Sequence, residues 1–330
     1  MTATWESLKR VDARGKVTGQ TLYPGDLIRP DMLYMKILFA GRPHARLLML
    51  DTSEAESYPG VVAVFTSRDV PVNEYGLITK DQPVLVGAGA PSGNSGADVA
   101  HFVGDQVALV VAETEKAASA ACDLIEIEWE DLPVVTDPRA AMAPNALLLF
   151  PGTDNNVLQH YRVRKGDTDA AWDQCAAIVE GRYHTPWQEH AYLAPEAGMA
   201  YIDRQGRVTV EVAGQWAHEE QEQIAHALGM PIDQVRVIHP AIGGAFGGRE
   251  DISVQIVLAI AAWRLSQRGI HRPVKIIWSR EESIKAHHKR HPYYINAKWG
   301  ADAHGKVLGV ECELVEDAGA YAYTSAKVLG

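Results

Sequence analysis

The stretch Ile242-Gly-Gly-Ala-Phe-Gly-Gly-Arg-Glu-Asp251 places two glycine pairs around one phenylalanine. It follows an apolar segment, Val235 to His239, that is typical of a β-strand. It precedes an apolar run at helical spacing, which predicts a long helix from about Glu250 to Gln267. A glycine loop between a strand and a helix can bring bare backbone N–H groups to an anion or an oxo ligand, helped by the helix dipole.

The spacing of these glycines excludes two common nucleotide-binding loops. Residues 243–248 read GGAFGG, which matches neither the dinucleotide fingerprint G-x-G-x-x-G nor the GK[ST] ending of a phosphate-binding P-loop. The alternative to a ligand-binding loop is a turn in which the glycines only supply positive φ angles. On this pattern alone, both interpretations stay open.

The segments around the loop alternate between strand and helix patterns. We predict a helix from His218 to Leu228 that ends at Gly229, and a hairpin formed by residues 294–299 and 307–313. The other elements predicted in this half are strands at 183–191, 199–202, 208–212 and 274–278 and a helix at 281–288. In the predicted helix after the loop, helical spacing indicates core packing for Ile252, Ile256, Val257 and Ile260.

The first third of the chain also mixes strands and helices. We predict strands at 33–40, 61–66, 106–112 and 125–129, and a helix at 114–124 with Thr114 as its N-cap. Residues 137–156 hold three prolines and a Gly-Thr-Asp-Asn cluster, which is typical of a boundary. The sequence therefore predicts an α+β fold with one domain over residues 1–140 and a second over residues 141–330.

Composition and charge exclude several classes of partner. The 330 residues include 42 acidic and 31 basic side chains, a formal net charge of −11, which repels nucleic acid and anionic lipid surfaces. The first residues lack the apolar core of a secretory signal, and no stretch reaches the roughly 18 apolar residues of a membrane span. We therefore expect a cytoplasmic protein that binds neither nucleic acid nor membrane. The three widely spaced cysteines, Cys122, Cys175 and Cys312, fit neither a disulfide framework nor an iron–sulfur site.

The stretch from Ile242 to Asp251 resembles the molybdopterin loop of the xanthine dehydrogenase and aldehyde oxidase family, because a basic residue and an acid follow the second glycine pair. Other stretches resemble landmarks of the same family in the same order. They are Gly15-Lys-Val-Thr-Gly19, Pro43-His-Ala-Arg46, Pro59-Gly-Val-Val-Ala63, Val103-Gly-Asp-Gln-Val107, His190-Ala-Tyr-Leu-Ala-Pro-Glu196 and Trp278-Ser-Arg-Glu-Glu282. The resemblance covers essentially the whole chain. It implies a hammerhead-type α/β domain followed by the first part of a mixed α/β molybdopterin-binding domain.

The resemblance also implies which residues meet the cofactor. The cofactor-binding loop would consist of Gly243, Gly244, Ala245, Phe246, Gly247 and Gly248, with Phe246 also facing the substrate. Gln215, 31 residues before Phe246, has the spacing of the family's glutamine that donates to the apical oxo group of molybdenum. A neutral amide suits that role because it stabilises an oxo group without protonating the metal centre. Without the resemblance, Gln215 would be interpreted as a solvated polar residue. Because the pterin dithiolene holds molybdenum in this family, we expect no side chain of this chain to bind the metal.

Glu250 is the second candidate catalytic residue. It lies four residues after Phe246, where the resemblance implies the substrate-facing glutamate of the purine-oxidising members; aldehyde-oxidising members tend to have an apolar residue there. A carboxyl group in a closed pocket can hold a ring N–H or take a proton from an N-heterocycle. The alternative is an acid in the first turn of a helix, where it complements the helix dipole.

Two other groups of polar residues are candidate sites. In AHHKRHP, His287 and His291 have the i, i+4 spacing of zinc ligands on a helix, but Pro292 ends that helix, which favours a structural or solvated basic cluster including His288. The resemblance places a second group near the substrate funnel, with no catalytic role: His184, Glu189, His190 and Glu196. No G-x-S-x-G motif supports a hydrolase.

The resemblance implies that this chain is an incomplete enzyme. Family members continue with a second loop, further pterin contacts and the general-base glutamate, which we expect on a second molybdenum-subunit chain; the alternative is a truncated product. We therefore expect an uncovered apolar surface near the hairpin. The implied reaction is hydroxylation of a carbon next to nitrogen in a purine or related N-heterocycle, with oxygen from water.

The implied cofactors extend beyond this chain. They are molybdopterin, as such or as its cytosine dinucleotide, and FAD and 2Fe-2S clusters on partner subunits that take the electrons. An aldehyde-oxidising relative and a non-catalytic remnant or assembly subunit are the alternative functions.

Overall fold

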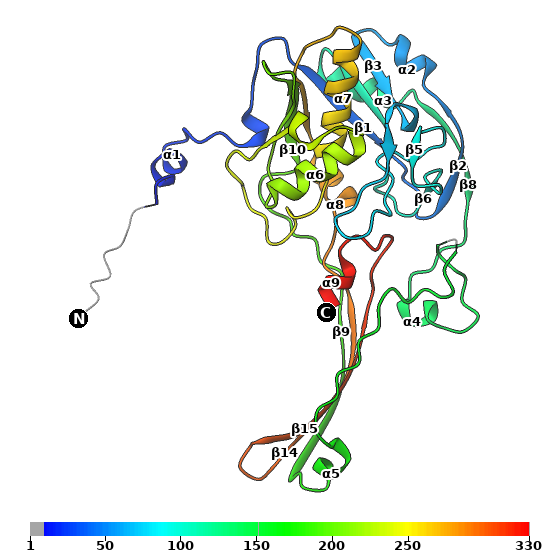
Figure 1. Ribbon diagram of the computed structural model, residues 1–330, viewed down its shortest axis with the longest axis vertical. Coiled ribbons are helices and arrows are strands. Elements are labelled where there is room, and N and C mark those ends of the chain that lie inside the picture. Colours follow the sequence, from blue (N-terminus) through cyan, green and yellow to red (C-terminus); the bar gives the residue numbers. More distant parts are fainter. Residues whose placement is uncertain (1–9, 151, 330) are drawn as a thin grey trace, which may run out of the picture.

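The computed structural model describes residues 10–150 and 152–329, and a seven-stranded mixed sheet forms its centre (Figure 1). The strand order is β12-β11-β10-β13-β1-β7-β3. These strands are β1 (Leu33–Phe39), β3 (Val61–Phe65), β7 (Gln106–Ala112), β10 (Ala197–Ile202), β11 (Val208–Val212), β12 (Val235–Ile238) and β13 (Val274–Ile277). Strand β13 pairs parallel with β1 and antiparallel with β10, so strands from both sides of residue 140 share one sheet. The domain boundary itself stays a prediction.

Helices cover both faces of this sheet. Helices α6 (Ala217–Leu228) and α7 (Gln255–Gln267) pack on one face, whereas α2 (Ser53–Ser57) and α3 (Glu115–Cys122) pack near β3 and β7 on the other. In β7, Leu109 joins the core under α7, while Val110 joins the core under α3. Because both faces of β7 are buried, its sequence after Gln106 is apolar throughout rather than alternating.

Local signals define the ends of two helices as the sequence predicted. The side chain of Thr114 caps α3 by accepting the backbone N–H of Ala117. Gly229 ends α6 in the left-handed conformation, with φ of 62°. The predicted core positions are also confirmed, because Ile256, Val257 and Ile260 in α7 and Ile252 just before it are all buried.

Smaller elements surround the central body. A second sheet, in the order β6-β2-β8, contains β2 (Ala45–Asp51), a strand that the sequence pattern did not predict. The remaining elements outside the projecting sheet described below are α1 (Ala13–Val17), η1 (Pro24–Asp26), η2 (Ser67–Asp69), β4 (Val72–Asn73), β5 (Ser92–Gly93), β6 (Val99–Ala100), β8 (Glu126–Asp131), α4 (Pro138–Ala141), η3 (Ile232–Gln234), α8 (Arg280–Ala286) and α9 (Ser325–Leu329).

A three-stranded antiparallel sheet extends away from the central body (Figure 1), and we call it the projecting sheet. It consists of β9 (Ala177–Thr185), β14 (Tyr293–Ala301) and β15 (Val307–Glu316), with α5 (Thr168–Trp172) at its far end. The predicted hairpin of residues 294–299 and 307–313 is confirmed, since β14 and β15 pair through it.

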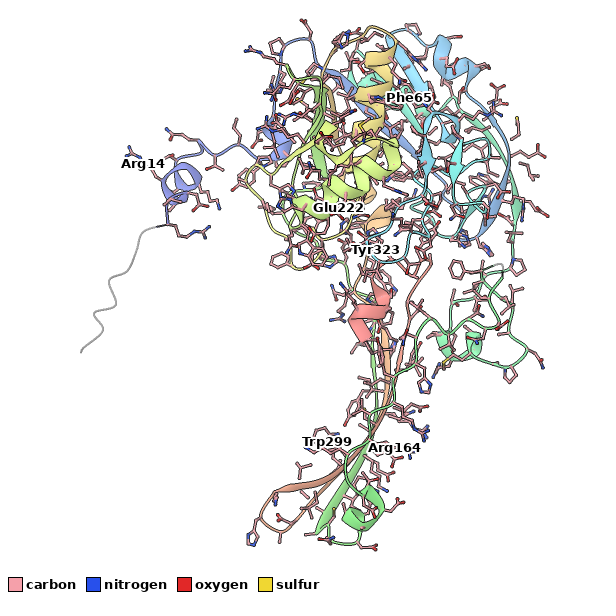
Figure 2. All side chains as sticks on the ribbon, viewed as in Figure 1. Arg14, Phe65, Arg164, Glu222, Trp299 and Tyr323 are labelled. Carbon is pink, nitrogen blue, oxygen red and sulfur yellow. The ribbon has the colours of Figure 1, made fainter. Side chains whose placement is uncertain are left out.

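The two faces of the projecting sheet differ in chemistry. On one face, which we call the apolar face, Trp299 lies opposite Val179 and Val310 on the neighbouring strands. Ile295, Tyr183 and Leu314 continue this face by the two-residue repeat of a strand. Figure 2 shows Trp299 far from the central body, and its side chain is 52% exposed. The other face carries charged side chains, listed here: Glu180, Arg182, Lys298, Glu311 and Glu313.

Two predicted elements differ from the structure. The predicted strand 183–191 is wrong, because β9 ends at Thr185; the next residue, Pro186, has no N–H for the ladder. The helix predicted from Glu250 begins only at Gln255. Side chains hold the backbone of Ser253 in a non-helical form, because Gln255 accepts its N–H and Gln106 donates to its carbonyl.

Candidate cofactor and substrate site

The glycine loop lies directly on the segment 190–195, which we call the platform. A Cβ atom added at Gly243 would lie 2.4 Å from the Cβ of Ala194, and one at Gly248 would lie 2.8 Å from the ring of His190. A Cβ at Gly244 would lie 2.8 Å from the Cβ of Tyr192. Three of the four glycines are therefore needed for close packing against the platform.

The turn at Phe246 and Gly247 is the part of the loop that faces open space. Gly247 has φ of 88°, and a Cβ there would meet no atom within 4 Å. Phe246 has φ of 52° and is 76% exposed. A left-handed conformation costs a residue with a side chain about 1–2 kcal/mol. Strain of this kind, beside an exposed aromatic ring, points to a functional position.

The buried side chain of Arg249 holds the loop on the platform. Only 3% of this residue is exposed, and its guanidinium donates to the carbonyl of Gly244 at 3.3 Å and to that of Ala194. The same group stacks over the ring of Tyr192, 4.0 Å from the ring centre. In the sequence analysis Arg249 counted only as the basic residue of the loop motif, with no role of its own.

Gln215, which follows β11, is held against the same loop. Its backbone N–H donates to the carbonyl of Arg249 at 2.9 Å, and its side-chain Oε1 accepts the N–H of Arg249 at 3.3 Å. Because the side-chain carbonyl is engaged, the amide NH₂ is the free end and can only donate. The structure thus brings Gln215 to the loop, as the predicted site requires, and leaves a hydrogen-bond donor exposed.

The helix dipole does not act on this loop as the sequence suggested. Because α7 begins at Gln255, neither the loop nor Glu250 lies at a helix N-terminus. This excludes the interpretation of Glu250 as an acid in the first turn. The buried positive charge that contacts the loop is the guanidinium of Arg249.

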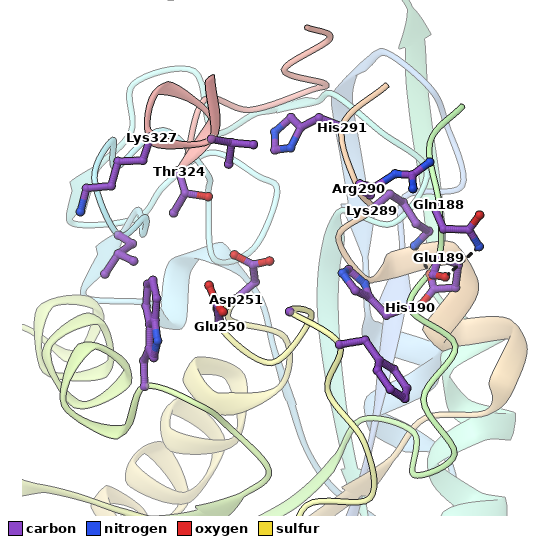
Figure 3. A pocket seen from close by; sticks show the side chains of 15 residues that line it. Gln188, Glu189, His190, Glu250, Asp251, Lys289, Arg290, His291, Thr324 and Lys327 are labelled. Carbon is purple, nitrogen blue, oxygen red and sulfur yellow. Dashed lines mark hydrogen bonds and ion pairs between the residues drawn. The ribbon is translucent and has the colours of Figure 1, made fainter. Parts of the chain in front are cut away.

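A cavity of about 690 Å³ lies in front of the loop (Figure 3). Its lining includes Phe246, Gly247, Glu250 and Trp216, together with polar residues of the segments 188–190 and 289–291. Figure 3 shows the carboxylates of Glu250 and Asp251 pointing into it. Gln215 and the three packed glycines do not line this cavity, and neither does Ala245. The predicted substrate-facing pair, Phe246 and Glu250, therefore shares one cavity.

The acidity of Glu250 is altered by its surroundings. Partial burial raises the pKa of its carboxyl group, and the neighbouring carboxylate of Asp251 raises it further. A carboxyl group of this kind exchanges a proton nearer to neutral pH than an ordinary glutamate does. Its position and its acidity both fit a group that holds a ring N–H or accepts a proton.

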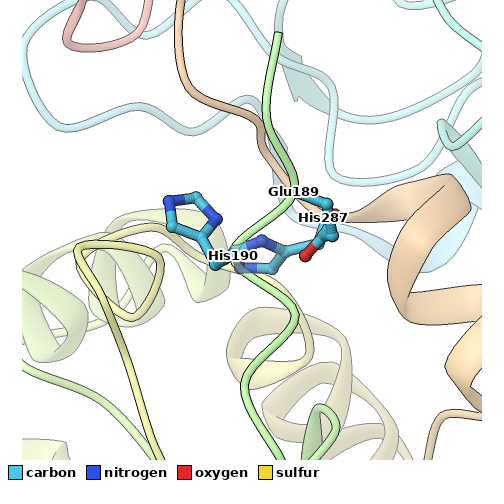
Figure 4. A group of neighbouring side chains, drawn as sticks. All are labelled: Glu189, His190 and His287. Carbon is cyan, nitrogen blue, oxygen red and sulfur yellow. The ribbon is translucent and has the colours of Figure 1, made fainter.

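Glu189, His190 and His287 form a compact group beside the cavity (Figure 4), with ligand-type atoms within 4.8 Å of one another. The ammonium of Lys289 lies 2.6 Å from the Glu189 carboxylate, so a positive charge already balances it. His287 is 3% exposed, and burial holds the pKa of its imidazole well below its usual value. Helix α8 ends at Ala286, so His287 and His291 do not share a helical face. That these residues have no catalytic or metal-binding role stays a prediction.

A buried acid under Gln215 was not found by sequence reasoning. Glu220 is 1% exposed, and its Oε2 lies 3.0 Å from Nε2 of His239. A Cβ at Gly214 would lie 1.8 Å from the other carboxylate oxygen, so only glycine fits before Gln215. The only signal in the sequence was Gly214 itself, and nothing in the pattern indicated that Glu220 packs against it.

Within the described residues, no helix combines the length and the apolar character needed to cross a membrane.

Comparison with known proteins agrees with this architecture. Residues 18–133 match the family model of the aldehyde oxidase and xanthine dehydrogenase a/b hammerhead domain, and residues 149–330 match that of the molybdopterin cofactor-binding domain. The chain therefore combines a hammerhead domain with a molybdopterin cofactor-binding domain. It belongs to the xanthine dehydrogenase and aldehyde oxidase family.

Individual relatives cover nearly all of this chain, but the chain covers only part of them. It is 37% identical over 321 residues to a probable xanthine dehydrogenase subunit of Bacillus subtilis, covering 97% of this chain and 41% of that protein. It is 36% identical to the nicotinate dehydrogenase large molybdopterin subunit of Eubacterium barkeri, covering 97% of this chain and 72% of that protein. The solved aldehyde oxidoreductase of Desulfovibrio gigas superposes with a TM-score of 0.85 at 27% identity, covering 93% of this chain and 34% of that one.

The residues of the site fit a molybdenum-bearing pterin. The open backbone at Gly247 allows close approach, the amide of Gln215 presents a donor, and the buried guanidinium of Arg249 supplies positive charge. An anionic group with oxygen ligands is what such a set of donors binds.

Proposed function

We propose that this chain forms one wall of the molybdenum site of a hydroxylase that oxidises a carbon next to nitrogen in a purine or related N-heterocycle. The observation that carries the proposal is the position of Glu250, which lines the cavity beside Phe246 and Gly247 instead of capping a helix. The relative from Eubacterium barkeri is part of a nicotinate dehydrogenase, and nicotinate is an N-heterocycle.

Each residue has a separate task in this proposal. When bound, molybdopterin supplies the transfer of water-derived oxygen and takes up two electrons. The backbone N–H of Gly247 and the amide of Gln215 donate hydrogen bonds to oxygens of the bound group. Glu250 orients the heterocycle through a ring N–H or takes a proton as charge develops on the ring. The exposed ring of Phe246 forms an apolar wall beside the substrate.

We further propose that the cofactor is molybdopterin, as such or as its cytosine dinucleotide, and that FAD and 2Fe-2S clusters on partner subunits receive the electrons. The general base and the remaining pterin contacts would lie on a second molybdenum-subunit chain. We propose that this complex works in the cytoplasm.

The uncovered apolar face supports the proposal of a second molybdenum-subunit chain. Val179 and Tyr183 on this face are 65% and 60% exposed, and Trp299 is 52% exposed. Exposed apolar side chains that adjoin on one sheet face mark a contact surface. The solved relative shares its fold with 93% of this chain, but this chain covers only 34% of that protein. We propose that a chain equivalent to the rest of that protein covers this face.

Two neighbouring residues of β9 test this contact, because Val179 and Glu180 point to opposite faces. We expect Val179→Lys to weaken assembly with the second chain by more than tenfold, since it places a charge in an apolar contact. Glu180→Lys is the matched control and should change it by less than twofold. The measurement is the dissociation constant of the purified pair, and equal effects of the two variants would contradict the proposal.

An aldehyde-oxidising enzyme is the second candidate function, favoured by the structural similarity to the Desulfovibrio gigas aldehyde oxidoreductase. The chain should be co-expressed with its neighbouring genes, purified as a complex, and analysed for molybdenum, pterin and nucleotide. Turnover is then measured with purines, nicotinate and aldehydes. We expect turnover of an N-heterocycle to exceed that of aldehydes. Turnover of aldehydes alone would support the second candidate, and a complex without molybdenum would indicate a remnant or assembly subunit.

A further inference from the structure

We infer that Arg249 is a positioning residue that sets both the shape and the charge of the cofactor-facing loop. The inference rests on the proposed role of the loop, and it concerns a residue to which the motif itself assigns no task. Its starting point is that Arg249 bonds three separate parts of the site: the start of the loop, the platform beneath it, and Gln215.

The side chain of Arg249 joins the loop to its platform. The guanidinium bonds the carbonyl of Gly244 on the loop, and the carbonyls of Ala194 and Pro195 on the platform. The ring of Tyr192 covers its face at 4.0 Å. The platform also donates one hydrogen bond to the loop, from the N–H of Ala194 to the carbonyl of Gly243 at 3.2 Å. Among the described residues, loss of the side chain therefore leaves that one hydrogen bond between the two segments at this end.

The backbone of Arg249 fixes the orientation of the Gln215 amide. Its N–H engages the Oε1 of Gln215, and its carbonyl accepts the backbone N–H of Gln215. Because a primary amide has one oxygen and one NH₂ group, holding the oxygen turns the NH₂ group outward. A shift of Arg249 would therefore move the donor of Gln215 together with the loop.

The charge of Arg249 also has an electrostatic consequence. The guanidinium is buried, and all the hydrogen bonds that it makes to described residues go to backbone carbonyls instead of carboxylates. No described carboxylate forms a salt bridge with it, although the buried carboxyl group of Glu220 lies near enough to interact with its charge. The guanidinium therefore supplies positive charge beneath the loop. Since α7 begins too late to contribute its dipole, Arg249 takes the role that the helix N-terminus was expected to have.

Arginine is required because the two tasks need different properties. A lysine at this position keeps the charge, but its single ammonium cannot bond carbonyls on both segments in a fork or stack flat on Tyr192. A methionine keeps much of the length and loses both. The variants Arg249→Lys and Arg249→Met thus separate charge from geometry.

Arg264 provides a matched control. Its guanidinium also bonds a backbone carbonyl, that of Asp69 at 2.7 Å, and stacks over Trp263 at 4.5 Å. It lies on α7 and does not line the cavity. Arg264→Met removes a comparable set of contacts without touching the loop.

The test measures two quantities in the assembled complex: backbone hydrogen exchange at Ala194 and Gln215, and molybdenum bound per complex after gel filtration. We expect Arg249→Met to speed exchange at both amides by at least tenfold and to lower bound molybdenum by about tenfold, the effect of losing one charged hydrogen bond. Arg249→Lys should exchange as fast as the methionine variant but retain more molybdenum. Arg264→Met should match wild type in both.

Three results would overturn the inference. They are wild-type exchange in Arg249→Met, fast exchange with wild-type molybdenum in that variant, and losses of the same size in Arg264→Met. A failure of the proposed function is distinguishable, because the wild-type complex itself would then contain no molybdenum. The exchange comparison would still test whether Arg249 holds the loop on its platform.

Discussion

Substituting alanine at two glycines of the loop separates packing from cofactor approach. At Gly243 the new Cβ would lie 2.4 Å from the Cβ of Ala194, more than 1 Å inside a normal carbon–carbon contact of about 3.5–4 Å. The loop must then move away from its platform. At Gly247 the new Cβ meets nothing within 4 Å, and only the positive φ of 88° is unfavourable. The two variants thus add one methyl group each to the same loop for different physical costs.

The magnitudes follow from these contacts. Overpacking at Gly243 costs about 1–3 kcal/mol, and the hydrogen bond from Ala194 to its carbonyl contributes about 1 kcal/mol more when broken. We therefore expect Gly243→Ala to lower the free energy of unfolding by about 2–4 kcal/mol. Gly247→Ala should lower it by only about 1 kcal/mol, the cost of placing alanine in the left-handed region.

The two variants should rank in the opposite order for cofactor binding: among molecules that stay folded, Gly247→Ala should lose more of the cofactor than Gly243→Ala. Gly247 lines the cavity, so a methyl group there occupies the space into which the bound group must come, whereas Gly243 does not line it. Urea unfolding of both variants, with molybdenum content of the assembled complex measured at low temperature, tests the pair. The reasoning is refuted if Gly247→Ala is as unstable as Gly243→Ala, or if it keeps full molybdenum.

Three further predictions concern other parts of the molecule. Burial raises the pKa of Asp105 to about 7, so between about pH 4 and 7 the folded state holds a proton that the unfolded state has lost, and stability falls as pH rises, by about 4 kcal/mol in total. Asp105→Asn should flatten this slope in urea unfolding at pH 5 and 8; an unchanged slope would contradict the assignment. The indole of Trp172 covers Gly300 and Gly309 on the projecting sheet, so Trp172→Ala should cost about 2 kcal/mol in thermal unfolding, and the control Trp187→Ala, at a 61% exposed site, should cost little. Glu250→Gln should lower kcat/KM for an N-heterocycle by about 10²-fold in the assembled enzyme. It should also remove the acid limb of the pH profile, which the raised pKa of Glu250 places at higher pH than an ordinary glutamate would. Glu222→Gln, on an exposed part of α6, is the control, and equal losses in the two variants would contradict a role for Glu250.

Sequence patterns predicted those elements whose ends depend on nearby residues. Strand β7 and helix α3 have almost their predicted bounds, because an apolar run and the cap at Thr114 define them locally. The α+β class and the hairpin of β14 and β15 were also predicted correctly. The start of α7 was not, since contacts of Ser253 with the distant Gln106 replace the first helical turn. Tertiary contacts of this kind leave no periodic signal.

The sequence likewise predicted only part of the site. The motif placed Gln215 and the loop together, and the structure shows contact through the backbone of Arg249. It did not predict that Gly243, Gly244 and Gly248 pack on the platform while Gly247 alone stays open, because packing depends on a platform that lies far from the loop in the sequence. The roles of Gln215 and Glu250 in catalysis stay predictions.

The place of β13 in the centre of the main sheet has a consequence for synthesis of the protein. Leu33 of β1 pairs with Val274 of β13, about 240 residues later. At a synthesis rate of about 5–20 residues per second, the inner edge of β1 waits on the order of 10–50 s for its neighbour. An apolar strand with an open edge can meanwhile pair with other nascent chains. Lower growth temperatures and added chaperones should therefore raise the yield of native protein.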